Sequence, residues 1–468
     1  MNNCHIHFNL SYKNSRLDKK NKFILRYAKV VGDMMDDDEY MHMIRRCLRC
    51  SICKWIPQLQ IKSKKYATIC PAIDMYNFHP YSGGGKIILA LALEMEKIKP
   101  SEELRDVVYK CTECGGCDIS CKFLFNLEPL EIIIKLREKL VELGYGPMPK
   151  QQQYIEAVKK VNNPYNEPHE KRLDWLPEDI ELDPNAKVLY YVGCTSSYRR
   201  KEMAIAAARI LNAAGVPFNI LEKDEFCCGS PVFRTGDINT FKEFLNKNLD
   251  VIEAKNIKTV IFSCAGCYDT FKVHYPLHRK YNFEVKHTVE FFNELIETGQ
   301  LELTNEVPLT VTYHDPCHLG RNAEPYEEWK GKVVKLMPLI SINVPPKPKR
   351  CGTYGVYESP RELLAKISGL KLVEMERIKE YSYCCGAGAG VKSAFPEFAL
   401  NTAKARIEEA EDTRAQVLTS CCPFCSTNLQ DAIHESSSIL KYYDINELLL
   451  MALGIHDGKL KESVEEIT

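Results

Sequence analysis

The sequence lacks a large net charge of either sign, and this absence bears on whether nucleic acids or membrane surfaces are its partners. Its 468 residues include 62 lysines and arginines against 63 aspartates and glutamates, for a formal net charge of -1. Proteins that bind nucleic acids or membrane surfaces often carry an excess of basic residues. Bulk charge therefore supports neither class, and nucleic acid is not expected as a partner.

Long apolar runs and a targeting segment are also missing. The longest apolar candidate, Ile87 to Leu93, falls well short of the ~18 residues that a membrane-spanning helix needs. The N-terminal segment 1–40 has no apolar stretch between a basic start and a small-residue cleavage site, so no secretory signal is indicated. We expect a soluble protein that lies in the cytoplasm or peripherally at the inner face of the cell membrane.

Cysteine, by contrast, is abundant. The chain has 21 cysteines and no secretory signal, and a reducing cytosol disfavours structural disulfides. Metal ligation or redox chemistry is then the leading explanation for so many thiols. The spacing of the cysteines therefore decides the functional prediction.

Composition and pattern predict an α+β multidomain protein. Helices are expected over 86–98 and 128–143, the latter with Asn126 as its cap, and six prolines between 147 and 187 indicate a semi-rigid linker. The predicted segments are an N-terminal tail 1–46 ending in an acidic run, a helical module 47–146, a proline-rich linker 147–187, two α/β repeats 188–300 and 301–453, and a C-terminal tail 454–468.

The two α/β repeats follow from an internal similarity. The first copy contains, in order, a strand-like run 188–192, Cys194, a helical pattern 203–213, a strand-like run 216–221, Cys227-Cys228 and Cys264-x-x-Cys267. The second copy contains a strand-like run 309–313, Cys317, a helical pattern 360–367, a strand-like run 370–374, Cys384-Cys385 and Cys422-x-x-Cys425. Short strands alternating with helices predict parallel sheets, and the loops at the carboxyl ends of their strands would bring the cysteines together.

The second copy is the longer one. In the first copy 33 positions lead from Cys194 to Cys227, whereas in the second 67 lead from Cys317 to Cys384. The excess predicts one insertion, and the proline-rich segment 322–355 has the matching length and composition. The sequence assigns this insertion no function.

The cysteines of the helical module have ferredoxin spacing. Cys111-x-x-Cys114-x-x-Cys117-x-x-x-Cys121 is the bacterial pattern, in which three thiolates bind one cubane cluster and the fourth serves the neighbouring cluster. A second, less regular group is Cys47-x-x-Cys50-x-x-Cys53, and Cys70 can supply its missing fourth ligand through a longer loop. Eight cysteines are thus available for two clusters.

Two cubane [4Fe–4S] clusters are the predicted occupants. The ligand exchange typical of two-cluster ferredoxins assigns Cys47, Cys50, Cys53 and Cys121 to one cluster, and Cys111, Cys114, Cys117 and Cys70 to the other. Zinc is the alternative, but zinc sites favour two cysteine pairs separated by a longer loop.

Each repeat offers five further cysteines. They are Cys194, Cys227, Cys228, Cys264 and Cys267 in the first copy, and Cys317, Cys384, Cys385, Cys422 and Cys425 in the second. Neighbouring cysteines on one loop do not easily share one tetrahedral ion, but they can bind two irons of a larger cluster, so each set indicates an unusual polynuclear site. Structural zinc, simple packing or a thioredoxin-like dithiol are the alternatives. Cys4, Cys351 and Cys421 remain, and none of them is expected to be a ligand.

Together these motifs resemble a known family. The pattern Cys…Cys-Cys-Gly…Cys-x-x-Cys, present twice behind a two-cubane ferredoxin module, is similar to the D subunit of heterodisulfide reductase over about residues 47–453. The D subunit itself resembles a fusion of two other heterodisulfide reductase components, the ferredoxin-like C subunit and the double cysteine-rich (CCG) domain of the B subunit. The resemblance implies that each complete five-cysteine set holds a noncubane [4Fe–4S] cluster, which makes the ten cysteines catalytic ligands.

The reaction that the resemblance implies is the two-electron reduction of a disulfide, either the coenzyme M–coenzyme B heterodisulfide or a related thiol/disulfide. Electrons would pass through the two cubane clusters to the paired noncubane clusters. Both sets are complete, whereas a set can be degenerate in the relatives that serve glycolate and lactate oxidation. The long 53-to-70 loop and the insertion 322–355 depart from the family pattern, so the substrate can differ accordingly.

An anionic disulfide requires cations near the cysteine loops. Arg199, five residues after Cys194, and Arg321, four after Cys317, share a repeat position and are the predicted substrate-binding pair. The further candidates are Arg200, Arg234 and Lys392. His314 and His318 flank Cys317, but a packed or hydrogen-bonded histidine is the more common arrangement, so they are left unassigned.

Two other function classes remain open. A non-catalytic electron-transfer subunit, linking a dehydrogenase or flavoprotein to a quinone or membrane cytochrome, would have nearly the same cysteines. A zinc-stabilised interaction scaffold would be colourless and free of iron. The sequence has no recognisable flavin or nicotinamide motif, so the expected partners are other redox subunits, such as a membrane cytochrome b, a flavoprotein, or a hydrogenase or dehydrogenase.

Overall fold

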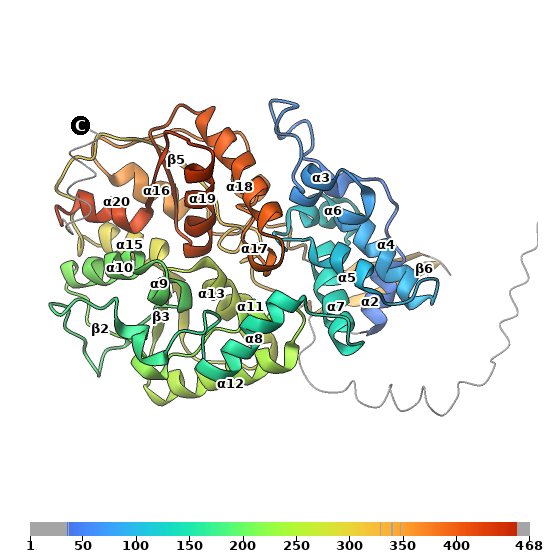
Figure 1. The fold of residues 1–468 in the computed structure, drawn as a ribbon, viewed down its shortest axis with the longest axis horizontal. Helices are drawn as coiled ribbons and strands as arrows, with labels where there is room; N and C mark the ends of the chain where they lie inside the picture. Colours follow the sequence, from blue (N-terminus) through green and yellow to red (C-terminus); the bar gives the residue numbers. More distant parts are fainter. Residues whose placement is uncertain (1–34, 36, 328, 338–339, 347, 456–468) are drawn as a thin grey trace, which may run out of the picture.

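The computed structural model describes residue 35 and residues 37–455, apart from 328, 338–339 and 347. Figure 1 shows a helical module, in blue, beside a larger body that contains two parallel sheets. The predicted α+β architecture, a helical module followed by two α/β repeats, is confirmed. Among the described helices, none combines the length and the apolar character of a membrane span.

The helical module packs around α7, whose buried residues Ile132, Leu136 and Leu140 recur every four positions and form one apolar stripe. This stripe contributes to one core with Ile87 and Ala90 of α4. The helices of the module are α2 (Asp37–Ile44), α3 (Pro71–Tyr76), α4 (Gly83–Glu94), α5 (Glu102–Tyr109), α6 (Gly116–Phe125) and α7 (Pro129–Glu142), with 3₁₀ turns at Ile52–Lys54 and His79–Tyr81.

Part of the predicted N-terminal tail 1–46 is a helix. α2 buries Tyr40, Met43 and Ile44 in the core of the helical module. The acidic run that suggested a tail lies at the first turn of α2, where negative side chains interact favourably with the helix dipole. The rest of this tail up to residue 34, and the C-terminal tail beyond residue 455, lie outside the described residues.

Asn126 does not cap α7 as predicted. It ends α6 in a left-handed conformation, with φ of 49°, which asparagine tolerates better than most residues, and Glu128 precedes α7 instead. An asparagine between two helices fits either role by composition, so the sequence alone favoured the wrong one.

The segment predicted as a linker, 147–187, contains helix α8 (Pro149–Val161) and a 3₁₀ turn at His169–Leu173. Pro149 occupies the first helical position, where a proline needs no hydrogen-bond donor. Ile155 and Val158 are fully buried in a cluster that includes Cys194 and Cys227 of the first repeat. α8 is therefore a wall of the first repeat rather than a spacer.

The first repeat forms a parallel sheet of strand order β2-β1-β3-β4, with Val188 of β1 opposite Phe218 of β2 and Thr259 of β3. Its elements are β1 (Val188–Tyr191), α9 (Cys194–Tyr198), α10 (Lys201–Ala213), β2 (Phe218–Asn219), α11 (Ser230–Phe233), α12 (Ile238–Ala254), β3 (Thr259–Phe262), α13 (Ala265–Asp269), α14 (Tyr275–His278), β4 (Glu284–His287) and α15 (Thr288–Glu297), with a 3₁₀ turn at Glu222–Asp224 and a π-helical segment at Thr270–His274.

The second repeat has the same topology, because its order β10-β9-β5-β8 corresponds strand for strand to that of the first repeat. Its elements are β5 (Thr310–Tyr313), α16 (Glu358–Lys366), β8 (Lys371–Leu372), α17 (Val391–Ala394), α18 (Pro396–Glu411), β9 (Val417–Ser420), α19 (Pro423–Glu435), β10 (Lys441–Asp444) and α20 (Ile445–Ala452), with a turn at Lys379–Tyr381. The predicted insertion 322–355 holds an antiparallel hairpin, β6 (Lys332–Met337) and β7 (Ile340–Val344).

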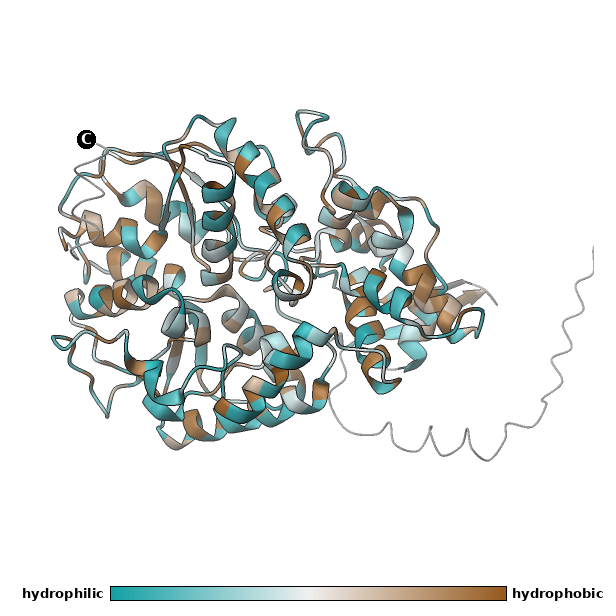
Figure 2. Ribbon diagram, in the orientation of Figure 1, coloured by the Kyte–Doolittle hydropathy of each residue, from teal (hydrophilic) through white to brown (hydrophobic). Residues whose placement is uncertain are grey.

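One apolar core runs through both repeats. The central strands are buried on both faces, as Leu189, Ile261, Val311 and Leu418 show, because helices cover both sides of each sheet. Figure 2 shows the corresponding alternation of apolar and polar colouring along the surrounding helices. Rigid sheets thus hold the loops that carry the cysteines.

Candidate functional site

The first predicted cubane set gathers around the start of α4. The thiols of Cys53 and Cys121 lie within hydrogen-bonding reach of each other, and the Cys121 thiol lowers the pKa of Cys53 to about 6. The backbone N–H of Gly84 donates to Cys53 Sγ at 3.2 Å, and the Cys47 thiol lies 3.9 Å from the Gly84 carbonyl oxygen. Cys50 is the exposed member of this set.

The second predicted set lies where the loop before α6 meets α3. Cys70 is the N-cap residue of α3, and burial raises the pKa of its thiol to about 12, with the thiols of Cys111 and Cys114 close enough to contribute. Lys86 is fully buried nearby, where burial lowers the pKa of its ammonium group. Four thiols beside one buried cation form a setting suited to a negatively charged group.

The glycines at the start of α4 test whether clusters fit here. A Cβ at Gly84 would lie 3.2 Å from Cys53 Sγ and 3.6 Å from Cys47 Sγ, while one at Gly83 would lie 3.1 Å from Cys117 Sγ. These side-chain-free positions separate the two thiol sets and leave the space in front of each free. Together with all-sulfur donor sets of four, the arrangement fits two iron–sulfur cubanes.

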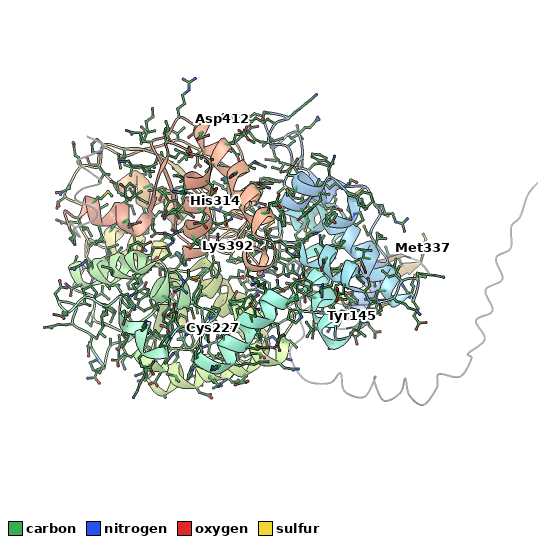
Figure 3. The ribbon with its side chains drawn as sticks, viewed as in Figure 1. Tyr145, Cys227, His314, Met337, Lys392 and Asp412 are labelled. Carbon is green, nitrogen blue, oxygen red and sulfur yellow. The ribbon has the colours of Figure 1, made fainter. Side chains whose placement is uncertain are left out.

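The ten repeat cysteines converge on a single large cavity of about 1140 Å³. All of them line it: Cys194, Cys227, Cys228, Cys264, Cys267, Cys317, Cys384, Cys385, Cys422 and Cys425. Cys194, Cys264, Cys317 and Cys422 follow the ends of β1, β3, β5 and β9, so the parallel sheets bring them to facing edges. In Figure 3, Cys227 and His314 mark the two repeats, with Lys392 between them.

In the first repeat the five thiols form one cluster. Cys267 Sγ lies 3.4 Å from Cys228 Sγ, and Cys194 and Cys227 lie within hydrogen-bonding reach of each other. Arg172 donates to Cys194 Sγ at 3.3 Å and forms a buried ion pair with Glu225. This arginine comes from the predicted linker, and nothing in its local sequence marks it.

In the second repeat a histidine joins the thiols. One ring nitrogen of His314 and the sulfurs of Cys385 and Cys425 all lie within 4.8 Å of one another, close enough to hold a metal ion together. Arg406 Nε lies 3.1 Å from His314 Nδ1, which orients the ring. The backbone N–H of Gly386 donates to Cys384 Sγ at 3.3 Å.

Two contacts connect the cysteine sets. Cys264 of the first repeat and Cys422 of the second lie within hydrogen-bonding reach of each other, so the two five-cysteine sets meet across the cavity. Cys114 of the helical module is similarly close to Cys384 of the second repeat. These two contacts join three of the four sets, and the second repeat adjoins the helical module.

The lining of the cavity is strongly basic. Six basic side chains line it against one acidic side chain, that of Glu156. The basic residues are Lys150, Lys160, Arg199, Arg200, Arg234 and Lys392. Arg199, Arg200, Arg234 and Lys392 were sequence candidates, whereas the lysines of α8 were missed because the segment was interpreted as a linker. Four of the six basic side chains, Arg199, Arg200, Arg234 and Lys392, also form ion pairs with carboxylates that lie outside the lining. The excess of basic side chains at the wall itself favours an anionic ligand.

Arg199 and Arg321, the predicted pair, have different surroundings. Arg199 lies at the cavity, where it pairs with Glu167 at 3.0 Å. Arg321 is buried and donates to the carbonyl oxygens of Cys114 (2.5 Å), Glu380 and Ser382 (both 2.7 Å), and it does not line the large cavity. Its guanidinium thus holds the loop that carries a predicted cluster ligand.

The remaining sequence candidates have the following positions. His318 lines the cavity and contacts the carboxylate of Asp269 at 3.2 Å. Cys421 is buried beside the Tyr313 hydroxyl at 3.2 Å, and Cys351 lies in the insertion, so neither lines the cavity. Cys4 lies outside the described residues.

A buried arginine joins the three parts of the protein. Arg137 of α7 donates to the carbonyl oxygens of Cys111 (2.7 Å), Arg234 (2.8 Å) and Ala389 (3.3 Å), and it pairs with Glu113 at 2.8 Å. These partners belong to the helical module and to both repeats. One fully buried side chain thus bridges the parts of the chain that carry the cysteine sets.

Comparisons with known proteins agree with this arrangement. Residues 188–272 and 311–430 match the cysteine-rich domain family, and residues 43–124 match the 4Fe-4S dicluster domain family. The chain is 35% identical over 417 residues to the D subunit of the dihydromethanophenazine:CoB–CoM heterodisulfide reductase of Methanosarcina mazei, covering 87% of this chain and 94% of that protein.

Two more distant similarities are to another oxidoreductase and to a solved structure. The EtfAB:quinone oxidoreductase of Syntrophomonas wolfei is 29% identical over 387 residues, which cover 76% of this chain and 49% of that protein. The crystal structure of a hypothetical protein from Helicobacter pylori aligns with a TM-score of 0.50 at 11% identity, covering 96% of this chain and 77% of that one. The structural likeness concerns the fold alone.

Proposed function

This chain belongs to the family of heterodisulfide reductase D subunits, and on that premise we propose that it reduces a disulfide by two electrons at the cysteine-lined cavity. It is an iron–sulfur oxidoreductase, as its ferredoxin-type module and its two cysteine-rich repeats indicate. The observation that carries the finer proposal is the convergence of all ten repeat cysteines on one basic cavity.

The proposed cluster ligands are the sets that the fold brings together. Cys47, Cys50, Cys53 and Cys121 would hold one cubane cluster, and Cys70, Cys111, Cys114 and Cys117 the other. The five cysteines of each repeat would hold a noncubane [4Fe–4S] cluster. Iron–sulfur clusters, when bound, supply one-electron redox chemistry.

The proposed reaction balances as R–S–S–R′ + 2 e⁻ + 2 H⁺ giving RSH + R′SH. The disulfide bond breaks, each sulfur gains one electron and one proton, and a reduced redox partner supplies the electrons one at a time. The protein's own contribution is binding and exclusion: cavity walls from three parts of the chain surround the disulfide, and the basic side chains hold its charged ends.

The coenzyme M–coenzyme B heterodisulfide, or a related disulfide, is the proposed substrate. The relative from Methanosarcina mazei is named for that substrate. The sulfonate, phosphate and carboxylate groups of the heterodisulfide require several cations. The cavity wall supplies Arg199, Arg200, Lys392, Lys150 and Lys160. We assign these residues, in place of Arg321, to substrate binding.

The proposed partners are other redox subunits, since the chain is similar to a named component of a multi-subunit reductase. A membrane cytochrome b, a flavoprotein or a hydrogenase or dehydrogenase would deliver the electrons to the helical module. A cytoplasmic position at the inner face of the membrane suits such a donor.

A second candidate is a non-catalytic electron carrier between a flavoprotein and a quinone. The similarity to an EtfAB:quinone oxidoreductase favours it. On this alternative the cavity would bind no disulfide, and the cysteine sets would only relay electrons.

Viologen-linked turnover tests the proposal. Anaerobically purified protein with full iron is mixed with reduced methyl viologen and the heterodisulfide, and viologen oxidation is followed with thiol release. We expect disulfide-dependent oxidation with two thiols formed per disulfide. Cys385→Ser, inside the cavity, should abolish turnover, whereas Cys351→Ser, outside it, should not. No disulfide-dependent oxidation by the iron-replete protein would favour the carrier.

A further inference from the structure

The hairpin β6–β7 presents several partly exposed apolar side chains. Val334 stands opposite Ile342 and Lys332 opposite Val344, so these four side chains share one face of the two-stranded ribbon. Ile342 and Val344 are 43% and 41% exposed. Next to the turn, Leu336 and Met337 are 57% and 62% exposed, and Figure 3 shows Met337 at the end of the molecule farthest from Cys227.

The base of the hairpin is fixed to the helical module. Lys349 Nζ donates to the Phe123 carbonyl oxygen at the end of α6 at 2.8 Å, and Arg350 pairs with Glu131 of α7 at 3.2 Å. Trp329 donates from its ring N–H to the Pro345 carbonyl oxygen at 3.0 Å. A ribbon with a fixed base and an uncovered apolar end is marginally stable in water by itself and gains stability when it is covered.

The charges around this face favour one kind of cover. From Trp329 to Arg350 the sequence holds six basic residues and no acidic one. Lys330, Lys332 and Lys349 are exposed. Protein–protein interfaces are depleted in lysine, whereas apolar side chains bordered by lysines and a tryptophan are typical of segments that lie in the interface of an anionic bilayer.

We propose that the β6–β7 hairpin docks the protein on an anionic lipid bilayer, with Leu336, Met337, Ile342 and Val344 entering the headgroup–acyl boundary and the exposed Lys332 contacting lipid phosphates. This proposal does not depend on the disulfide chemistry. It places the bilayer on the side of the molecule that carries the helical module, to which the base of the hairpin is attached.

Vesicle co-sedimentation tests the docking. The anaerobic holoprotein is mixed with protein-free vesicles of phosphatidylcholine, either alone or with phosphatidylglycerol. We expect binding only to the anionic vesicles, weakening as salt rises. Lys332→Gln should weaken binding about fivefold, since each lysine at an anionic surface contributes about 1 kcal/mol. The double variant Leu336→Ser/Met337→Ser should weaken it about tenfold or more.

Matched controls are available elsewhere on the second repeat. The control variants are Ile439→Ser and Lys371→Gln, and both should bind vesicles as the wild type does. Ile439 is 93% exposed near β10, and Lys371 is exposed on β8. Iron content and visible absorbance of every variant should equal those of the wild type, which separates docking from misfolding. Lipid docking would be overturned if the hairpin variants bound vesicles as well as the wild type does. It would also be overturned if the protein bound only native membranes and lost that binding when their integral proteins were digested by protease.

Discussion

At the residue scale, the glycine at position 84 leaves the space that the Cys47 and Cys53 thiols occupy. Gly84 lies in the first turn of α4, where the two sulfurs approach the backbone closely. Spacing identified these thiols in the sequence, but not the backbone that must pass between them.

Gly84→Ala should therefore weaken one cluster and leave the others. Its added methyl would lie 3.2 Å from Cys53 Sγ, so we expect a partial loss of iron that does not exceed about 4 of the ~16 irons of four [4Fe–4S] clusters, measured by iron and acid-labile sulfide analysis. Gly299→Ala is the control, because its Cβ would meet no neighbour within 4 Å although its φ is +73°. That control should lose some stability but no iron, and a loss of more than one cluster's iron from Gly84→Ala would contradict the assignment of Cys47 and Cys53 to a single cluster.

Arg199 is the residue whose proposed contact with substrate is tested most simply. Arg199→Gln should raise KM for the heterodisulfide about fivefold, the loss of about 1 kcal/mol for a partly exposed charge, and leave kcat within about twofold. Arg209→Gln removes a surface arginine that pairs with Asp179 at 2.9 Å, and its kinetics should match the wild type. A fall in kcat with unchanged KM would exclude a binding role for Arg199.

At the element scale, helix α8 shows where the sequence interpretation failed. The repeat strands were predictable, because short apolar runs ending in glycine or cysteine recur in the same order. α8 was not, because its prolines indicated a linker and its lysines have no meaning until the helix is packed against the first repeat. The same reason hid Arg172, whose role exists only beside Cys194 and Glu225.

Helix α20 carries a pH-dependent contribution to stability. Glu447 is the third residue of its capping box and accepts from the Asp444 N–H at 2.8 Å, and burial raises the pKa of its carboxyl to about 7. The folded state thus holds this proton more tightly than the unfolded state, whose pKa is about 4.3. Stability is lost as pH rises from about 4 to about 7.

Glu447→Gln keeps the capping hydrogen bond and removes the charge. We expect it to be more stable than the wild type by about 2 kcal/mol at pH 8, with the advantage shrinking toward pH 5. Anaerobic calorimetry at both pH values measures this difference. A variant less stable than the wild type at pH 8 would show that the carboxylate is favourable where it lies.

At the scale of the whole molecule, three of the four sets of cysteines are joined by contacts that no sequence motif announces. Cysteine spacing, taken with the ligand exchange typical of two-cluster ferredoxins, supplied the predicted membership of each set. It did not predict that Cys114 meets Cys384 or that Cys264 meets Cys422, because these contacts depend on how three parts pack. The net charge of -1 likewise concealed the basic cavity and the basic hairpin.

Arg137 should keep the helical module and the two repeats in their relative positions. Arg137→Met leaves the carbonyl oxygens of three segments and one carboxylate short of a partner, so we expect a loss of about 3 kcal/mol in stability and slower electron transfer from the helical module to the cavity. Calorimetry and stopped-flow reoxidation of the reduced protein measure the two effects.

The matched control is Arg279→Met, which removes a surface arginine paired with Asp250 and Glu253 at 2.6 Å each. It should cost less than about 1 kcal/mol and leave electron transfer unchanged. If Arg137→Met were no worse than this control, the buried arginine would not be what aligns the cysteine sets.

The most direct test of disulfide chemistry in the cavity is low-temperature electron paramagnetic resonance of the oxidised, iron-replete protein after incubation with coenzyme M or coenzyme B. We predict a new paramagnetic signal that depends on the thiol, is absent in Cys385→Ser and persists in Cys351→Ser. An unchanged spectrum from protein with ~16 irons would contradict the proposal that the cavity binds substrate sulfur.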